Sequence, residues 1–114
     1  KANEALAGYT GGVMSLRLYQ LGLAQLGLAR ESNDLKLYKD AGLSFMRVVA
    51  YFHLRSRYEG GALVGAAEVH IAIDELKHAR DLLNRAGNLV TEEEDPDLYK
   101  HLLKLQEQAA QTSE

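Results

Sequence analysis

Apolar residues recur along most of the chain at intervals of three and four, the spacing of one face of an α-helix. The pattern predicts five helices, with bounds near 13–31, 35–54, 60–73, 75–86 and 96–108. The second of these shows a single apolar stripe. The first carries leucines on more than one side. We therefore expect it to be buried on two sides or to expose an apolar face that favours association. No segment shows the alternation of a strand, and the fold is therefore expected to be all-α.

Residues that favour helix ends support these boundaries. The Ser-Asn-Asp stretch at 32–34 can accept hydrogen bonds from free amides at a helix start. Asp95 precedes Pro96, and proline suits the first position of a helix. Asp74 is expected to interrupt the helical pattern. Gly87 is expected to adopt the left-handed conformation just past the end of the fourth helix.

The predicted helices form one domain over residues 13–108. Residues 1–12 contain three glycines, which weaken a helix, so we expect a separate N-terminal segment there. Residues 109–114 are expected to fray. Because the first residue is Lys rather than Met, we expect a fragment or a processed product.

Composition and charge exclude several classes of function. The 114 residues include no Cys, which rules out disulfides, Cys-ligated zinc and thiol catalysis. A net charge of −3 is too weak to indicate a nucleic-acid partner. The longest apolar stretch, 18–29, is interrupted by glutamines and is too short to span a membrane.

The charge is nevertheless divided unevenly between the two halves. Residues 1–57 carry 8 basic and 4 acidic side chains, whereas residues 58–114 carry 5 basic and 12 acidic ones. Such a molecule could stack head to tail or present different faces to different partners. Alternatively, the acidic run over 92–97 is simply a solvated loop.

The stretch GGALVGAAEVHIAIDELKHARDLLNRAG, from Gly60, resembles a tetratricopeptide repeat, a 34-residue helix–turn–helix unit. Ala67 and Ala79 fall at small positions where two antiparallel helices can approach closely, and Asp74 falls at the turn. The resemblance implies a right-handed α-α superhelix of about five helices, with two helical hairpins and a C-terminal capping helix. It also implies a non-catalytic protein without a cofactor.

The helix over 35–54 supplies an earlier copy of the same pattern, with a period of 38 residues from Ala41 to Ala79. Its first helix is expected over residues 16–31. In this family the first helix of each repeat lines a groove that binds a peptide, a helix or a partner subunit. The resemblance places there Leu21, Ala24, Leu28 and Glu31 from the earlier copy, and Gly61, Val64, Glu68, Ile71 and Ala72 from the later one. Alternatively, the N-terminal segment or another subunit covers these residues.

The stretch between the two copies is similar to the elongated linker of tetratricopeptide proteins in the bacterial cell envelope, namely outer-membrane assembly lipoproteins and the Tol–Pal-associated coordinator. Tyr51, Phe52, Ser56 and Tyr58 match that linker, and His53 stands where proline is usual. The resemblance implies a periplasmic or cell-envelope location, and the cytoplasm stays open as the alternative.

Two further functions remain open at this stage. The helix over 13–31 could assemble a homo-oligomeric structural subunit. His70, Asp74 and His78, spaced by four and four, would share a face of one continuous helix and could ligate zinc in a metal-dependent bundle. The repeat interpretation instead breaks that helix at Asp74 and separates the two histidines.

Basic side chains also gather at the junction between the repeats. The cluster consists of Arg47, His53, Arg55 and Arg57. The cluster could bind an acidic partner, or it could be a solvated surface.

Overall fold

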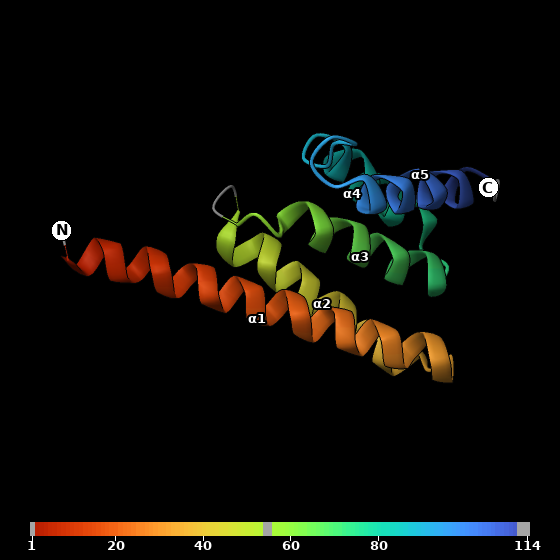
Figure 1. The fold of residues 1–114 in the computed structure, drawn as a ribbon. Coiled ribbons are helices and arrows are strands. Elements are labelled where there is room, and N and C mark those ends of the chain that lie inside the picture. The colour runs from red at the N-terminus through yellow and green to blue at the C-terminus, as the bar shows by residue number, and fades with distance from the viewer. Residues whose placement is uncertain (1, 54–55, 112–114) are drawn as a thin grey trace.

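The computed structural model describes residues 2–53 and 56–111, and side chains over 12–53 and 56–110. Five helices account for most of these residues (Figure 1). They are α1 (Ala2–Ser32), α2 (Leu35–Phe52), α3 (Glu59–Ala72), α4 (Leu76–Gly87) and α5 (Pro96–Gln111). No strand occurs within the described ranges, so the all-α expectation is confirmed.

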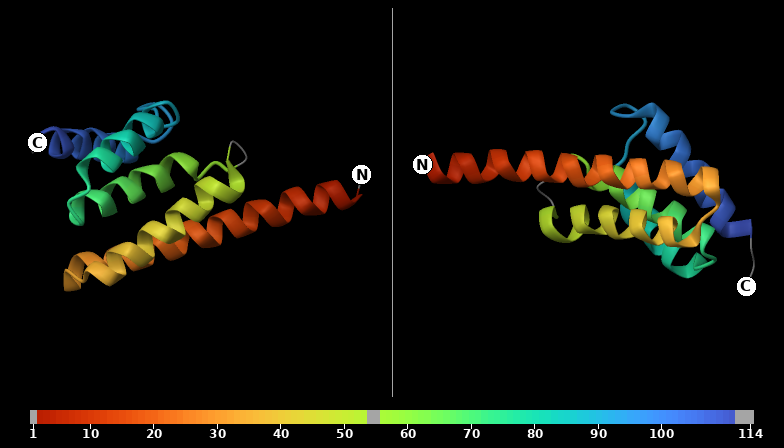
Figure 2. Two further views of the ribbon diagram at one scale, coloured as in Figure 1. Left: turned by 180° about the vertical axis from the view of Figure 1, so that it is seen from behind. Right: turned by 90° about the horizontal axis from the view of Figure 1, so that it is seen from below.

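The helices pack in a regular order. Each helix contacts the next one in sequence, and α3 also contacts α1 and α5. Across the described residues, α2 and α4 make no contact with each other. The odd-numbered helices thus form one layer and the even-numbered helices the other, while the N-terminal turns of α1 extend beyond the end of α2 (Figure 2).

The turns are formed by the residue types that the sequence indicated. The carboxylate of Asp34 accepts the Lys36 amide at 2.9 Å at the start of α2. Asp95 accepts the Leu98 amide at 3.1 Å at the start of α5. Asn33 and Asp74 are the non-glycine residues with positive φ in the described chain, at 55° and 65°. The predicted helix break at Asp74 is therefore confirmed.

Three predicted helix ends are wrong. Helix α1 begins at Ala2 and runs through its glycines, because glycine costs only about 1 kcal/mol in a helix and leaves helical φ and ψ accessible. Gly87 belongs to the last turn of α4, without positive φ, and Asn88 follows it as the C-cap. Helix α5 continues to Gln111, and Ala109 in this last stretch is fully buried. Residues 112–114 lie outside the described chain.

The core is centred on α3, where ten of fourteen residues are buried. Ala67 and Ala79 are both fully buried in the packed α3–α4 pair, as close helix crossing requires. Phe45 of α2 is also fully buried, and its ring fills the space beside Gly22 of α1 and Gly65 of α3. Among the described helices, none is both long and apolar enough to cross a membrane.

Candidate functional site

One side of α1 carries a row of exposed apolar side chains. Met14, Leu21 and Leu28 are 45%, 45% and 55% exposed, and Ala24 lies exposed among them. The spacing of seven residues keeps these three large side chains on the same side of the helix. We call Met14, Leu21, Ala24 and Leu28 the α1 row. The predicted site residue Glu31 is exposed at its C-terminal end.

The predicted site residues on α3 have a different environment. Gly61 and Val64 are buried, and the Tyr19 ring covers the position that a Cβ on Gly61 would take. Ile71 is half-buried against the core, and Ala72 is exposed. Gly61 and Val64 therefore offer no surface to a ligand in this structure.

The two predicted sets do not line one groove. The α1 residues that contact α3 include Tyr19, which covers Gly61, and Arg30, which binds Glu68. Leu21 and Leu28 each lie two residues away from one of them, which is about 200° around the helix. The α1 row thus points away from α3.

The register used in the sequence comparison differs by one residue from the spacing of the two turns. Asn33 and Asp74, the left-handed residues of the two hairpin turns, lie 41 positions apart. The sequence comparison paired Leu21 with Gly61, which are 40 positions apart. On a helix a single position rotates a side chain by about 100°, enough to move it from one face to another. By the positions of the turns, the counterpart of Val64 on α1 is Leu23, which is 46% exposed.

Glu68, the remaining predicted residue, is bound within the molecule. Nε and Nη2 of Arg30 donate to its two carboxylate oxygens, each at 2.6 Å. Nε2 of His101 lies 3.0 Å from the same carboxylate. This ion-pair cluster joins α1, α3 and α5 at one point. The sequence pattern missed it because the three residues are far apart in the chain and no local spacing relates them.

The cluster controls the ionisation of Glu68. Burial alone would raise the pKa of this carboxyl above its ordinary value. The hydrogen bonds from Arg30 and His101 and their positive charge outweigh burial and lower the pKa to about 2. The bond to Glu68 in turn raises the pKa of Arg30. Glu68 is therefore a carboxylate at neutral pH, and its oxygens are already occupied.

Replacing Arg30 with methionine should lower the free energy of unfolding by about 1–2 kcal/mol at pH 7, since half of the arginine side chain is exposed and screened. In the wild type, the low folded pKa of Glu68 stabilises the fold above pH 4.5. That contribution is lost as the pH falls from 4.5 towards 2. The difference in the free energy of unfolding between the wild type and Arg30→Met should therefore become smaller as the pH falls through this interval.

Urea unfolding at pH 7 and pH 3 measures this change. Arg85→Met, at an exposed arginine of α4, is the matched control and should show a small effect at both values. An Arg30→Met deficit that is independent of pH would contradict the assigned role of Glu68.

His70 and His78 lie on either side of the turn at Asp74. Their ring centroids are 5.4 Å apart, so the expectation that the helix break separates them is wrong. Nδ1 of His70 lies 2.7 Å from a carboxylate oxygen of Glu75. Within the described part of the chain, no three His, Cys, Asp or Glu residues form a group that could hold a metal ion. The alternative of one continuous helix through Asp74 is likewise wrong.

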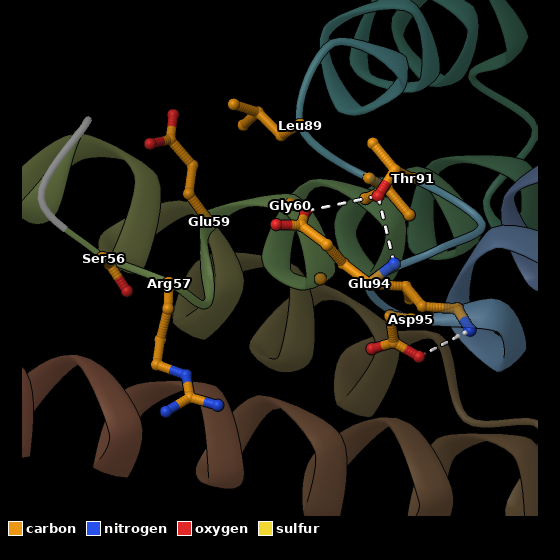
Figure 3. A pocket seen from close by; sticks show the side chains of 11 residues that line it. Ser56, Arg57, Glu59, Gly60, Leu89, Thr91, Glu94 and Asp95 are labelled. Atoms are coloured by element: carbon orange, nitrogen blue, oxygen red, sulfur yellow. Dashed lines mark hydrogen bonds between the residues drawn. The ribbon is translucent and has the colours of Figure 1, made fainter.

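A hollow of about 580 Å³ lies between the start of α3 and the α4–α5 loop (Figure 3). Its polar side chains serve local structure. Glu94 bonds to the hydroxyl of Thr91, and Asp95 caps α5. Arg57 and Glu59 point away from Glu94 and Asp95 in Figure 3. The hollow thus holds no paired acid and base aimed at a common point.

The basic residues of the repeat junction are also partly engaged. The Arg57 guanidinium lies over the Tyr58 ring at 5.5 Å, and Tyr58 stacks on Tyr19 at 5.4 Å. Nδ1 of His53 lies 2.6 Å from the buried Glu59 carboxylate. Arg47 is exposed, and Arg55 lies outside the described residues.

Burial and the nearby Asp95 raise the pKa of Tyr19.

No protein-family model, curated protein or solved structure matches the chain.

Proposed function

We propose that this chain is a non-catalytic protein–protein interaction module built as a tetratricopeptide-like array. Three features support the array. Helix α3 contacts both α1 and α5 while, in the described chain, α2 and α4 do not contact each other. Both hairpin turns use a left-handed residue. The small Ala67 and Ala79 are buried in the α3–α4 pair. The function needs no cofactor, because binding follows from burial of apolar surface.

The observation that carries the proposal is the α1 row. Three large apolar side chains, each 45% or more exposed, lie along one side of a helix. Contiguous exposed apolar surface is typical of protein-binding sites. The proposed binding surface is therefore this side of α1, rather than the groove first predicted between α1 and α3.

The proposed ligand is an amphipathic helix. A helix that packs along α1 presents apolar side chains at intervals of three, four and seven residues, which match the row. Leu21 and Leu28 are the central anchors. The cell-envelope location implied by the linker resemblance stays a prediction, and no metal function is proposed for His70, Asp74 and His78.

A displayed library of amphipathic helical peptides tests the proposal. We expect enriched peptides to carry helically spaced apolar residues. They should bind the double variant Leu21→Glu, Leu28→Glu at least about tenfold more weakly, as the loss of two anchors predicts. The control is Leu43→Glu, at a leucine of α2 that is 53% exposed. Selected peptides that bind all three proteins equally would refute the proposed surface.

A further inference from the structure

Two opposite charges lie along the α1 row, Arg17 between Met14 and Leu21 and Glu31 beyond Leu28. Arg17 and Glu31 are both exposed on α1. Neither forms an ion pair with another described residue. Fourteen positions separate them, which is about 21 Å along a helix, so they cannot pair within one copy.

The positions of these charges are symmetric about Ala24, one of the four residues of the row. Arg17 lies seven residues before Ala24, and Glu31 lies seven residues after it. Leu21 and Leu28 lie three before and four after the same alanine. The two charges without offset, and the two leucines to within one residue, are placed so that this side of α1 is complementary to itself when it is read in the opposite direction.

We propose that a second copy of this chain occupies the α1 row, with the two α1 helices antiparallel about a two-fold axis near Ala24. In this arrangement each Arg17 meets Glu31 of the second copy. Each Leu21 packs against Leu28 of the second copy, and the two Ala24 residues let the helices approach closely at the axis. Such an interface is isologous, because the same patch serves both copies.

Charge selects the antiparallel orientation. In a parallel pair in register, Arg17 would face Arg17 and Glu31 would face Glu31, and like charges at close range are repulsive. The antiparallel pair instead forms two Arg17–Glu31 contacts at the edges of an apolar seam.

This inference rests on the proposed function, since it names the partner of the same surface. The two can fail separately. A chain that binds helical peptides at the α1 row but stays monomeric overturns the inference and leaves the proposed function standing. A chain that self-associates through the row but selects no helical peptide overturns the proposed binding of helical peptides and leaves the inferred dimer standing.

Light scattering over a concentration series tests the association. The molar mass should rise from 12.6 kDa towards twice that value. Leu28→Gln should weaken the dimer about tenfold or more, because each dimer loses two anchors. Leu43→Gln, at an equally exposed leucine of α2, should leave it unchanged. A mass that stays at 12.6 kDa up to about 1 mM protein, or equal losses in both variants, would overturn the proposal.

Charge reversal tests the orientation. Arg17→Glu and Glu31→Arg should each weaken self-association, since each places like charges opposite one another. An equimolar mixture of the two variants should recover the dimer, because both contacts in the mixed pair are again between opposite charges. Lys77→Glu, at an exposed lysine of α4, is the control and should have no effect. A mixture no more associated than either variant would overturn the antiparallel arrangement.

The lack of cysteine in the chain allows a direct test of the axis. Ala24→Cys should form a disulfide-linked dimer under mild oxidation, because the two copies of this position lie next to each other. Ala50→Cys, at an exposed alanine of α2, should remain monomeric under the same conditions. Equal cross-linking of the two variants would place the contact elsewhere.

Discussion

Replacing Phe45 with alanine is expected to lower the free energy of unfolding by about 3–5 kcal/mol. The ring is fully buried. It belongs to α2 but fills the space between Gly22 of α1 and Gly65 of α3, and it packs 6.0 Å from the Tyr19 ring. Removal of the ring thus opens a cavity where three helices meet. A loss of this size is a large part of the 5–15 kcal/mol that is typical of a domain.

Urea unfolding followed by circular dichroism measures this loss. The chain offers one matched control, because Phe52 is its only other phenylalanine. Phe52 is partly exposed at the end of α2 and packs on Tyr51. Phe52→Ala should cost less than about 1.5 kcal/mol by the smaller area it uncovers. Similar losses in the two variants would show that Phe45 is not the centre of the core.

Gly65→Ala is expected to destabilise the fold by about 2 kcal/mol, although alanine is the better helix former. A Cβ on Gly65 would lie 2.6 Å from the Phe45 ring, far inside van der Waals contact. The ring is enclosed on all sides and has little space to move. The strain of overpacking should therefore exceed the gain in helix propensity.

Gly27→Ala is the control for this substitution, and its sign should be opposite. Gly27 lies in α1. A Cβ at this position would meet no atom within 4 Å apart from its chain neighbours and the nearby backbone of its own helix. The variant should gain about 0.5–1 kcal/mol from helix propensity alone. Thermal unfolding of both variants gives the comparison. A Gly65→Ala protein that is as stable as Gly27→Ala would contradict the close approach of α2 and α3.

Local chemistry predicted much of the fold. Asp34, Asp74 and Asp95 each marked a helix boundary, because side-chain capping and left-handed φ depend on only a few neighbouring residues. The start of α1 was mispredicted for a related reason. Glycine lowers helix stability but does not forbid helix, so a count of glycines does not locate a break. The slot for Phe45 depends on glycines of two other helices, and no local pattern reveals it.

The candidate site was predicted less well than the fold. The sequence placed Leu21, Ala24 and Leu28 on one side of α1 because they keep helical spacing whatever the neighbouring helix does, and all three are exposed. Whether this side faces α3 depends on how the turn at Asn33 positions α1, and each residue of displacement along a helix rotates a side chain by about 100°. The bonds from Arg30 and His101 to Glu68 cross between helices, so only the assembled fold could show that this carboxylate is already occupied.

The central place of α3 has a consequence for how this molecule can change. Helix α3 contacts all four other helices and keeps few residues at the surface. Most substitutions along it therefore disturb two or more neighbours at once, and only small side chains fit at Gly61 and Gly65. Sequence divergence is then expected mainly on the outer sides of the other four helices. Relatives of this chain should keep α3 nearly constant while the outer sides of the other helices vary.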